Sequence, residues 1–186
     1  GFKSRDIGPG NCLIDSWVRK NSKYKFDEDG ILASTGKRND IIFEQAQELF
    51  ANRPNQNTLS FDVNDFDISF ARGLNLEDGA ATLTAFSAKI ISSGICSILK
   101  EHDKKIIKII ICGGGRKNLS LVNQIKNNSK KNLFFYNSED FNLNGDFIES
   151  QAFGYLAIRS VLSLPISFPS TTGCMSPCSG GVIVKF

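Results

Sequence analysis

The stretch IIKIIICGGGRKNLSLVNQI, residues 106–125, decides the fold class of this 186-residue chain. Its first seven residues, 106–112, form a short run that is rich in β-branched side chains and almost wholly apolar. Such a run is typical of a strand covered on both faces. Three glycines follow, and leucine, valine and isoleucine then recur at helical spacing. The next apolar run, LFFY at 133–136, predicts a second strand. Strand, glycine loop, helix and strand form a βαβ unit, so we expect an α/β fold.

Helical periodicity brackets this unit on both sides. Apolar residues at three- and four-residue steps predict further helices, the longest of them near 75–100. Gly79 and Gly94 weaken the helix propensity of that segment, which indicates either that packing holds the helix or that a neighbouring backbone comes close at Gly94. The other predicted helices begin after Asn11 or span 40–52 and 147–162. Surface segments without a regular element are expected at 21–39 and 53–72, and a last short strand at 182–186.

Composition limits the class of protein. At about 150 residues per domain the length predicts one globular domain. The 22 Lys and Arg residues against 19 Asp and Glu leave a net charge of +3, too small to indicate a nucleic-acid partner. No continuous apolar run approaches the ~18 to 20 residues that cross a bilayer, and residues 1–10 lack the apolar core of a secretory signal. Five scattered cysteines form no even-numbered disulfide framework, so we expect a reducing compartment, most simply the cytoplasm.

The triple glycine at 113–115 is the first candidate site. It follows a predicted buried strand and precedes a helix, where glycine lets the backbone approach a ligand closely. The pattern is neither GxGxxG nor a Walker loop, because GK[ST] is absent. It therefore indicates either a ligand loop or only a tight turn between strand and helix.

The second candidate is Asp6 with the glycine-rich turn Gly8, Pro9, Gly10 and Asn11. A carboxylate beside a nest of amide donors suits phosphate held next to a general base or a magnesium ion. The alternative is an ordinary turn in which Asp6 accepts local backbone hydrogen bonds. Asn11 is in either case the expected N-cap of the following helix.

Other polar residues carry weaker signals. Glu149 lies in the first turn of its predicted helix, where it improves the dipole interaction or, facing a cleft, hydrogen-bonds sugar hydroxyls. Asp146 is equally well explained as the N-cap of that helix and as a residue with a role in binding or catalysis. Cys174 and Cys178 have C-x3-C spacing, but with His102 as the lone histidine four zinc ligands are hard to assemble. The same scarcity argues against Ser-His-Asp and Cys-His mechanisms.

Four segments in the same order carry a resemblance. RDIGPGNCLIDSW, ICGGGRKN, DFIESQAFGYLAIR and SLPISFPSTTG resemble the C-terminal half of the anhydro-N-acetylmuramic acid kinase family, within the sugar kinase, Hsp70 and actin superfamily. The resemblance runs across essentially all 186 residues. It implies a ribonuclease H-like C-terminal lobe of an actin/hexokinase-type kinase over 1–186, with a mixed sheet flanked by helices.

The resemblance also implies an activity. In that family ATP phosphorylates the 6-oxygen of 1,6-anhydro-N-acetylmuramic acid while water opens the anhydro bridge, which returns N-acetylmuramic acid 6-phosphate to peptidoglycan recycling. The expected cofactors are ATP and Mg²⁺, and the expected base that activates the water is Asp6. The positions that match the family's phosphate loop are Gly8, Gly10 and Asn11. Those that match its adenosine motif are Gly113, Gly114, Gly115 and Asn118. Glu149 matches a glutamate expected to bind the sugar.

The chain also departs from the family pattern. Ile7 replaces a threonine of the DTG motif, and Ser150 and Gly154 stand where alanine is usual. The family's N-terminal half, with its GTSxDGxD phosphate motif, is not matched. We therefore expect a separated or truncated lobe that is inactive alone, takes its N-terminal lobe from another chain and forms homo-oligomers. The alternative is a non-catalytic remnant or interaction module. A Rossmann-type dinucleotide binder is disfavoured because the acids after the second strand, at 139 and 140, come too late.

Overall fold

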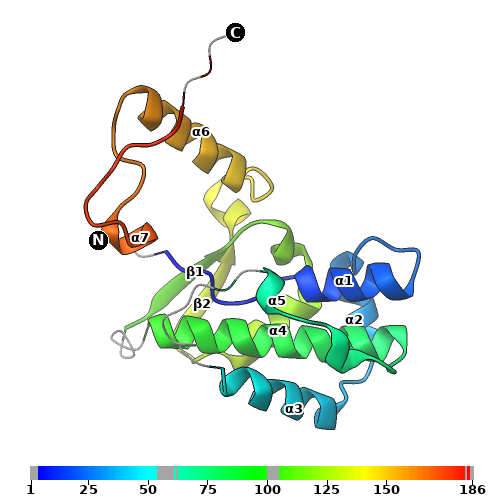
Figure 1. Cartoon of the computed structure of the whole chain (residues 1–186). Coiled ribbons are helices and arrows are strands. Elements are labelled where there is room, and N and C mark those ends of the chain that lie inside the picture. Colours follow the sequence, from blue (N-terminus) through cyan, green and yellow to red (C-terminus); the bar gives the residue numbers. More distant parts are fainter. Residues whose placement is uncertain (1–3, 54–60, 62, 100–104, 183, 185–186) are drawn as a thin grey trace.

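The computed structural model describes residues 4–53, 61, 63–99, 105–182 and 184 (Figure 1). Seven α-helices and two strands occur in this part of the chain, joined by short 3-10 helices. The elements are α1 (Cys12–Asn21), α2 (Ile31–Thr35), α3 (Asp40–Ala51), α4 (Leu76–Ile98), β1 (Ile107–Ile111), α5 (Leu119–Asn128), β2 (Leu133–Asn137), α6 (Ile148–Val161) and α7 (Pro169–Thr172). The four long helices predicted outside the βαβ unit are confirmed as α1, α3, α4 and α6.

Helix α4 is the centre of the core. It contacts α1, α2, α3 and α5, and twelve of its 23 residues are buried (Figure 1). Asn75 caps its start, because the side-chain oxygen accepts the Asp78 N–H at 2.7 Å. Trp17 of α1 lies flat against Gly79, where an added Cβ would come within 2.2 Å of the indole ring. The indole Nε1 donates to the Leu76 carbonyl at 2.9 Å, so glycine lets the two helices pack closely.

By length and composition alone, α4 could cross a membrane. In its most apolar window, 56% of the residues are buried inside the protein. Burial against four other helices is the behaviour of a core helix.

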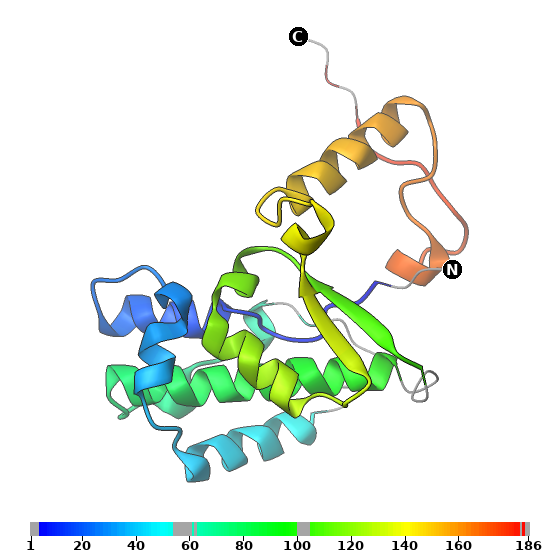
Figure 2. The same ribbon diagram turned by 180° about the vertical axis from the view of Figure 1, so that it is seen from behind.

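The two strands form a parallel sheet whose crossover is α5 (Figure 2). Ile107 pairs with Leu133, and the register continues to Ile111 opposite Asn137. This confirms the predicted βαβ unit and the α/β class. Covering on both faces was wrong for β1, because its burial alternates and Lys108 and Ile110 are exposed. The sheet in the described residues is parallel and two-stranded, not mixed, and two strands leave the ribonuclease H-like topology a prediction.

The two expected surface segments are more ordered than their composition indicated. Within 21–39, the 3-10 helix η1 (Glu28–Gly30) leads into α2, and buried Asp27 accepts the N–H groups of Leu32 and Ala33 at 2.8 and 3.0 Å. The polar composition of this segment predicted solvent exposure. The prediction was wrong for Asp27, whose buried carboxylate caps the start of α2.

The second segment, 53–72, carries aromatic residues onto the core. Phe66 stacks on Phe50 at 5.8 Å, and Phe70 lies 5.0 Å from Phe86 of α4, both measured between ring centroids. Residues 54–60 and 62 lie outside the described part. Irregular spacing of apolar residues therefore did not mean surface exposure, because the 3-10 helices η2 (Val63–Asp65) and η3 (Ser69–Ala71) alter the period.

The C-terminal part extends away from the helical layer (Figures 1 and 2). Helix α6 has no buried residue, and Phe153, Tyr155 and Ile158 are among its exposed apolar side chains. Ser170 of α7 accepts the Ser4 N–H at 3.4 Å, which brings the tail beside the N-terminal segment. The strand expected at 182–186 falls largely on residues outside the described part, as does His102.

Candidate functional site

The segment that carries Asp6 crosses closely over α4. An added Cβ at Gly8 would come within 2.8 Å of Ile91, and one at Gly94 within 2.7 Å of Ile7. A close approach is therefore present at Gly94, but the neighbouring atoms belong to the side chain of Ile7 and not to the backbone. Two glycines, one on each segment, set how deeply the Asp6 segment rests on the core helix.

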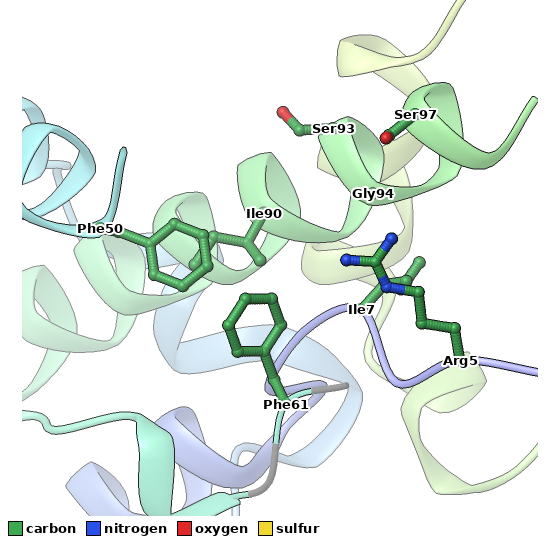
Figure 3. A pocket seen from close by; sticks show the side chains of 8 residues that line it. All are labelled: Arg5, Ile7, Phe50, Phe61, Ile90, Ser93, Gly94 and Ser97. Atoms are coloured by element: carbon green, nitrogen blue, oxygen red, sulfur yellow. The ribbon is translucent and has the colours of Figure 1, made fainter. Parts of the chain in front are cut away.

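The neighbours of Asp6 face inward. Arg5 and Ile7 line a small pocket of about 80 Å³ over α4, together with Phe50, Phe61, Ile90, Ser93, Gly94 and Ser97 (Figure 3). Binding sites for drug-sized molecules are about 300–1,000 Å³, so this pocket is too small for a nucleotide or a sugar. Asp6, between the two inward residues, is exposed.

The turn after Asp6 leads directly into α1. Gly10 has φ +55°, with no atom within 4 Å of the place where a Cβ would stand. Asn11 occupies the N-cap position of α1, but its φ and ψ are −83° and −8° and its side chain makes no capping bond. The predicted N-cap position of Asn11 is therefore confirmed, but its side chain makes no capping hydrogen bond and binds Asn118 instead. Burial raises the pKa of the adjacent Cys12 thiol, which keeps it neutral near pH 7.

The three glycines after β1 form a tight turn with open space around it. Gly113 has φ +74° and continues into the 3-10 helix η5 (Gly114–Lys117). Apart from adjacent residues in the chain, no atom of the described residues lies within 4 Å of a Cβ placed at any of the three glycines. Packing within the described residues therefore does not explain why glycine occupies these three positions. This is compatible with the prediction that the loop binds a ligand.

Asn118 joins the two candidate loops. Its side chain is buried, accepts the Leu121 N–H at 3.0 Å as the N-cap of α5, and donates from Nδ2 to Asn11 Oδ1 at 3.3 Å. Asn11 and Asn118 are 107 positions apart in the sequence, and their hydrogen bond brings together the residue that ends the Asp6 turn and the residue that follows η5. The family resemblance predicts that both loops hold one nucleotide, but it does not identify the hydrogen bond between Asn11 and Asn118.

Arg116 is a residue that the sequence analysis missed. Its Nη1 donates to Asp146 Oδ1 at 2.7 Å and to the Gly113 carbonyl at 2.9 Å, and its Nη2 donates to Glu139 Oε1 at 2.7 Å. Lys117 adds a second contact to Asp146 at 2.8 Å. These acids follow β2, whose carboxyl end meets that of β1 at one sheet edge, and this signal was available in the sequence.

The hydrogen bonds from Arg116 hold the pKa of the Glu139 and Asp146 carboxyls near 2, well below their usual range. Asp146 was a candidate N-cap of α6, but Phe147 occupies that position. Asp146 instead pairs with both cations of η5, Arg116 and Lys117.

Glu149 is exposed on the first turn of α6, three residues after Asp146. Helix α6 begins beside the triple glycine and then runs away from the helical layer (Figure 1). The structure therefore joins the loops of Asp6 and Gly113 through Asn11 and Asn118, but it records no such link for Glu149.

All five cysteines are free thiols. Cys174 and Cys178 lie close enough to interact, and burial with the proximity of Cys174 raises the pKa of the Cys178 thiol. No group of three or more His, Cys, Asp or Glu side chains suited to a metal ion occurs among the residues described.

Comparison with known proteins adds to this geometry. The model of the family "Anhydro-N-acetylmuramic acid kinase" matches residues 2–185. An anhydro-N-acetylmuramic acid kinase from Pelagibacter ubique strain HTCC1062 is 50% identical over 184 residues, which are 99% of this chain and 49% of that protein. A kinase of the same name from Zymomonas mobilis is 40% identical over 180 residues, covering 96% of this chain and 47% of the relative.

The chain thus spans about half the length of the curated relatives it matches, which is consistent with the expected C-terminal half. The match extends over both glycine loops, the ion pairs of Arg116 and helix α6. The chain belongs to the anhydro-N-acetylmuramic acid kinase family.

Proposed function

We propose that this chain is the nucleotide-facing lobe of an ATP-dependent kinase that converts 1,6-anhydro-N-acetylmuramic acid to N-acetylmuramic acid 6-phosphate in peptidoglycan recycling. The observation that carries the proposal is the hydrogen bond between Asn11 and Asn118, 3.3 Å long. It joins the loop expected to hold phosphates to the loop expected to hold adenosine. One nucleotide can span both only if they are neighbours.

The open glycine positions favour a nucleotide at this edge. Gly10, Gly113, Gly114 and Gly115 have no atom within 4 Å of a Cβ position, so the backbone is accessible to a ligand. The start of the ten-residue helix α1 lies immediately after the Gly8–Asn11 turn, and a helix N-terminus attracts phosphate through its free N–H groups and dipole.

Asp6 has the exposure that its proposed role requires. In the proposed reaction, water attacks C1 of the anhydro sugar, Asp6 accepts the water's proton, and the C1–O6 bond breaks. The released O6 then attacks the γ-phosphorus of ATP, with ADP as the leaving group. General-base catalysis of this kind contributes about 10² to 10⁴-fold. Mg²⁺ would neutralise charge on the phosphates, and the exposed Asp6 carboxylate is a suitable oxygen donor for it or for one of its waters.

The remaining half of the relatives' length is where we place the rest of the active site. Phosphoryl transfer depends on preorganised groups on both sides of the transferred phosphate, and the described chain presents one side. We infer that this segment by itself does not turn over. The exposed side chains of Phe153, Tyr155 and Ile158 on α6 favour a protein partner, either the complementary lobe or a second copy of this chain. We also infer a cytoplasmic location.

A chimera tests the proposal directly. This chain replaces the matched half of the Pelagibacter ubique kinase, and the product is followed by mass spectrometry with ATP, Mg²⁺ and 1,6-anhydro-N-acetylmuramic acid. We expect N-acetylmuramic acid 6-phosphate from the chimera and none from the chain alone. A folded chimera that binds ATP and forms no product would contradict the catalytic role and support the non-catalytic alternative.

A further inference from the structure

Arg116 makes contacts with three separate segments at the triple-glycine edge. Its guanidinium binds the Gly113 carbonyl in its own loop, Glu139 in the 3-10 helix η6 (Ser138–Phe141) after β2, and Asp146 just before α6. The Arg116 side chain is only 9% exposed, whereas those of Glu139 and Asp146 are 48% and 43% exposed. The cation is thus enclosed by the loops that it joins.

The geometry of these contacts favours a defined shape. Nε and Nη2 both reach Glu139 Oε1, at 3.0 and 2.7 Å, while Nη1 serves Asp146 and Gly113. The planar guanidinium offers five N–H donors in a fixed arrangement, and charge-assisted bonds of this type are about twice as strong as neutral ones. A lysine at this position has the charge but lacks the planar donor set.

Backbone contacts extend the same connection. The Gly113 N–H donates to the Gly145 carbonyl at 2.9 Å, and the Gly145 N–H donates to Glu139 Oε1 at 3.2 Å. An added Cβ at Gly145 would lie 2.5 Å from Arg116 Nε, so the approach requires glycine. Gly113, in its left-handed conformation, is therefore held through both its N–H and its C=O.

Gly114 and Gly115 lie between these fixed points and have no neighbours where their side chains would be. A loop of three glycines has high conformational entropy, and its ordering has to be supplied by bonds at its ends. Arg116 supplies them at the carbonyl of Gly113 and at the start of α6.

We propose that Arg116, together with Glu139 and Asp146, is a positioning residue that keeps the Gly113–Gly115 loop in the shape that receives the nucleoside part of the nucleotide. This inference rests on the proposed function. The guanidinium acts through the loop and makes no contact with the nucleotide. Its loss weakens recognition of the nucleoside more than that of the phosphates, because the phosphates are assigned to the Gly8–Asn11 turn.

The experiment compares three ligands on the full 186-residue chain. A fluorescent N-methylanthraniloyl-ATP is bound in the presence of Mg²⁺ and displaced by ATP, by adenosine or by tripolyphosphate. For Arg116→Gln we expect about tenfold weaker binding of ATP and adenosine, and an unchanged constant for tripolyphosphate. Arg116→Lys should show an intermediate loss. Lys126→Gln is the matched control, because Lys126 is exposed on α5 and is not among the residues that Arg116 contacts.

Asp146→Asn and Glu139→Gln give the same readout if Arg116→Gln fails to fold, since each removes the charge of one of the two carboxylates that bind Arg116. Equal weakening of all three ligands would show a merely structural role and overturn the inference. Unchanged adenosine affinity in folded Arg116→Gln, or in both acid variants, would overturn it as well. If the unaltered chain bound none of the three ligands, the proposed function would fail, and this inference with it.

Discussion

Asn118 donates a hydrogen bond to Asn11 across 107 residues of sequence, at 3.3 Å, while its own oxygen caps α5. One buried amide thereby fixes the start of α5 and the relative position of two glycine loops. The oxygen of Asn118 also lies against Gly30, where an added Cβ would come within 2.4 Å, so three segments meet at this side chain.

Replacement of Asn118 by alanine should destabilise the fold. The change removes a helix cap and leaves the Asn11 amide without this donor, which together cost about 1–3 kcal/mol. Urea unfolding followed by circular dichroism measures the loss. Asn123→Ala, at an exposed position of the same helix, is the control and should change stability by less than about 0.5 kcal/mol. Equal effects of the two variants would contradict the linking role.

Replacement of Asp6 by asparagine should remove turnover from the chimera. The substitution keeps size and removes the base, so we expect a loss of about 10² to 10⁴-fold in kcat. Asp29→Asn is a matched control, since Asp29 is exposed and asparagine tolerates its φ of +53°. Wild-type kcat in Asp6→Asn would rule out the assigned base.

Two helical glycines should respond oppositely to alanine. At Gly94 the new methyl group meets Ile7 at 2.7 Å and shifts the Asp6 segment, so we expect lower stability and lower chimera activity. At Gly154 of α6 nothing lies within 4 Å, and helix propensity alone should add about 0.5–1 kcal/mol. Thermal unfolding of both variants provides the comparison, and a stabilising Gly94→Ala would contradict the close crossing.

The ion pairs of Arg116 should weaken only when the pH falls below about 4. The pKa values of Glu139 and Asp146 are lowered to about 2, from ordinary values of 4.5 and 3.8. Carboxyls with depressed folded-state pKa values stabilise the fold fully above their ordinary values, and this contribution is lost as pH falls toward 2. The stability difference between the chain and Glu139→Gln/Asp146→Asn should therefore be constant from about pH 7 to 5 and shrink below about pH 4. A difference that already shrinks between pH 7 and 5 would contradict these ion pairs.

The sequence predicted regular elements better than their surroundings. Periodicity located α4 and the βαβ unit, because both consist of long or strongly patterned apolar runs. It failed at Asp27 and Phe66, since a buried cap and an aromatic residue on an irregular segment leave no period to detect. The residue pattern indicated Asp6 and the glycine loops as candidate sites, and the family resemblance supplied their expected roles. The hydrogen bond between Asn11 and Asn118 depends on tertiary packing, so no local sequence pattern predicted it.

The most direct test of the account is a titration of the ¹⁵N-labelled chain with ATP and Mg²⁺, followed through backbone amide shifts. We predict that amides of the Gly8–Asn11 turn and of Gly113–Gly115 shift together, with one shared dissociation constant. Shifts confined to one of these loops, or two unequal constants, would contradict a single nucleotide held by both.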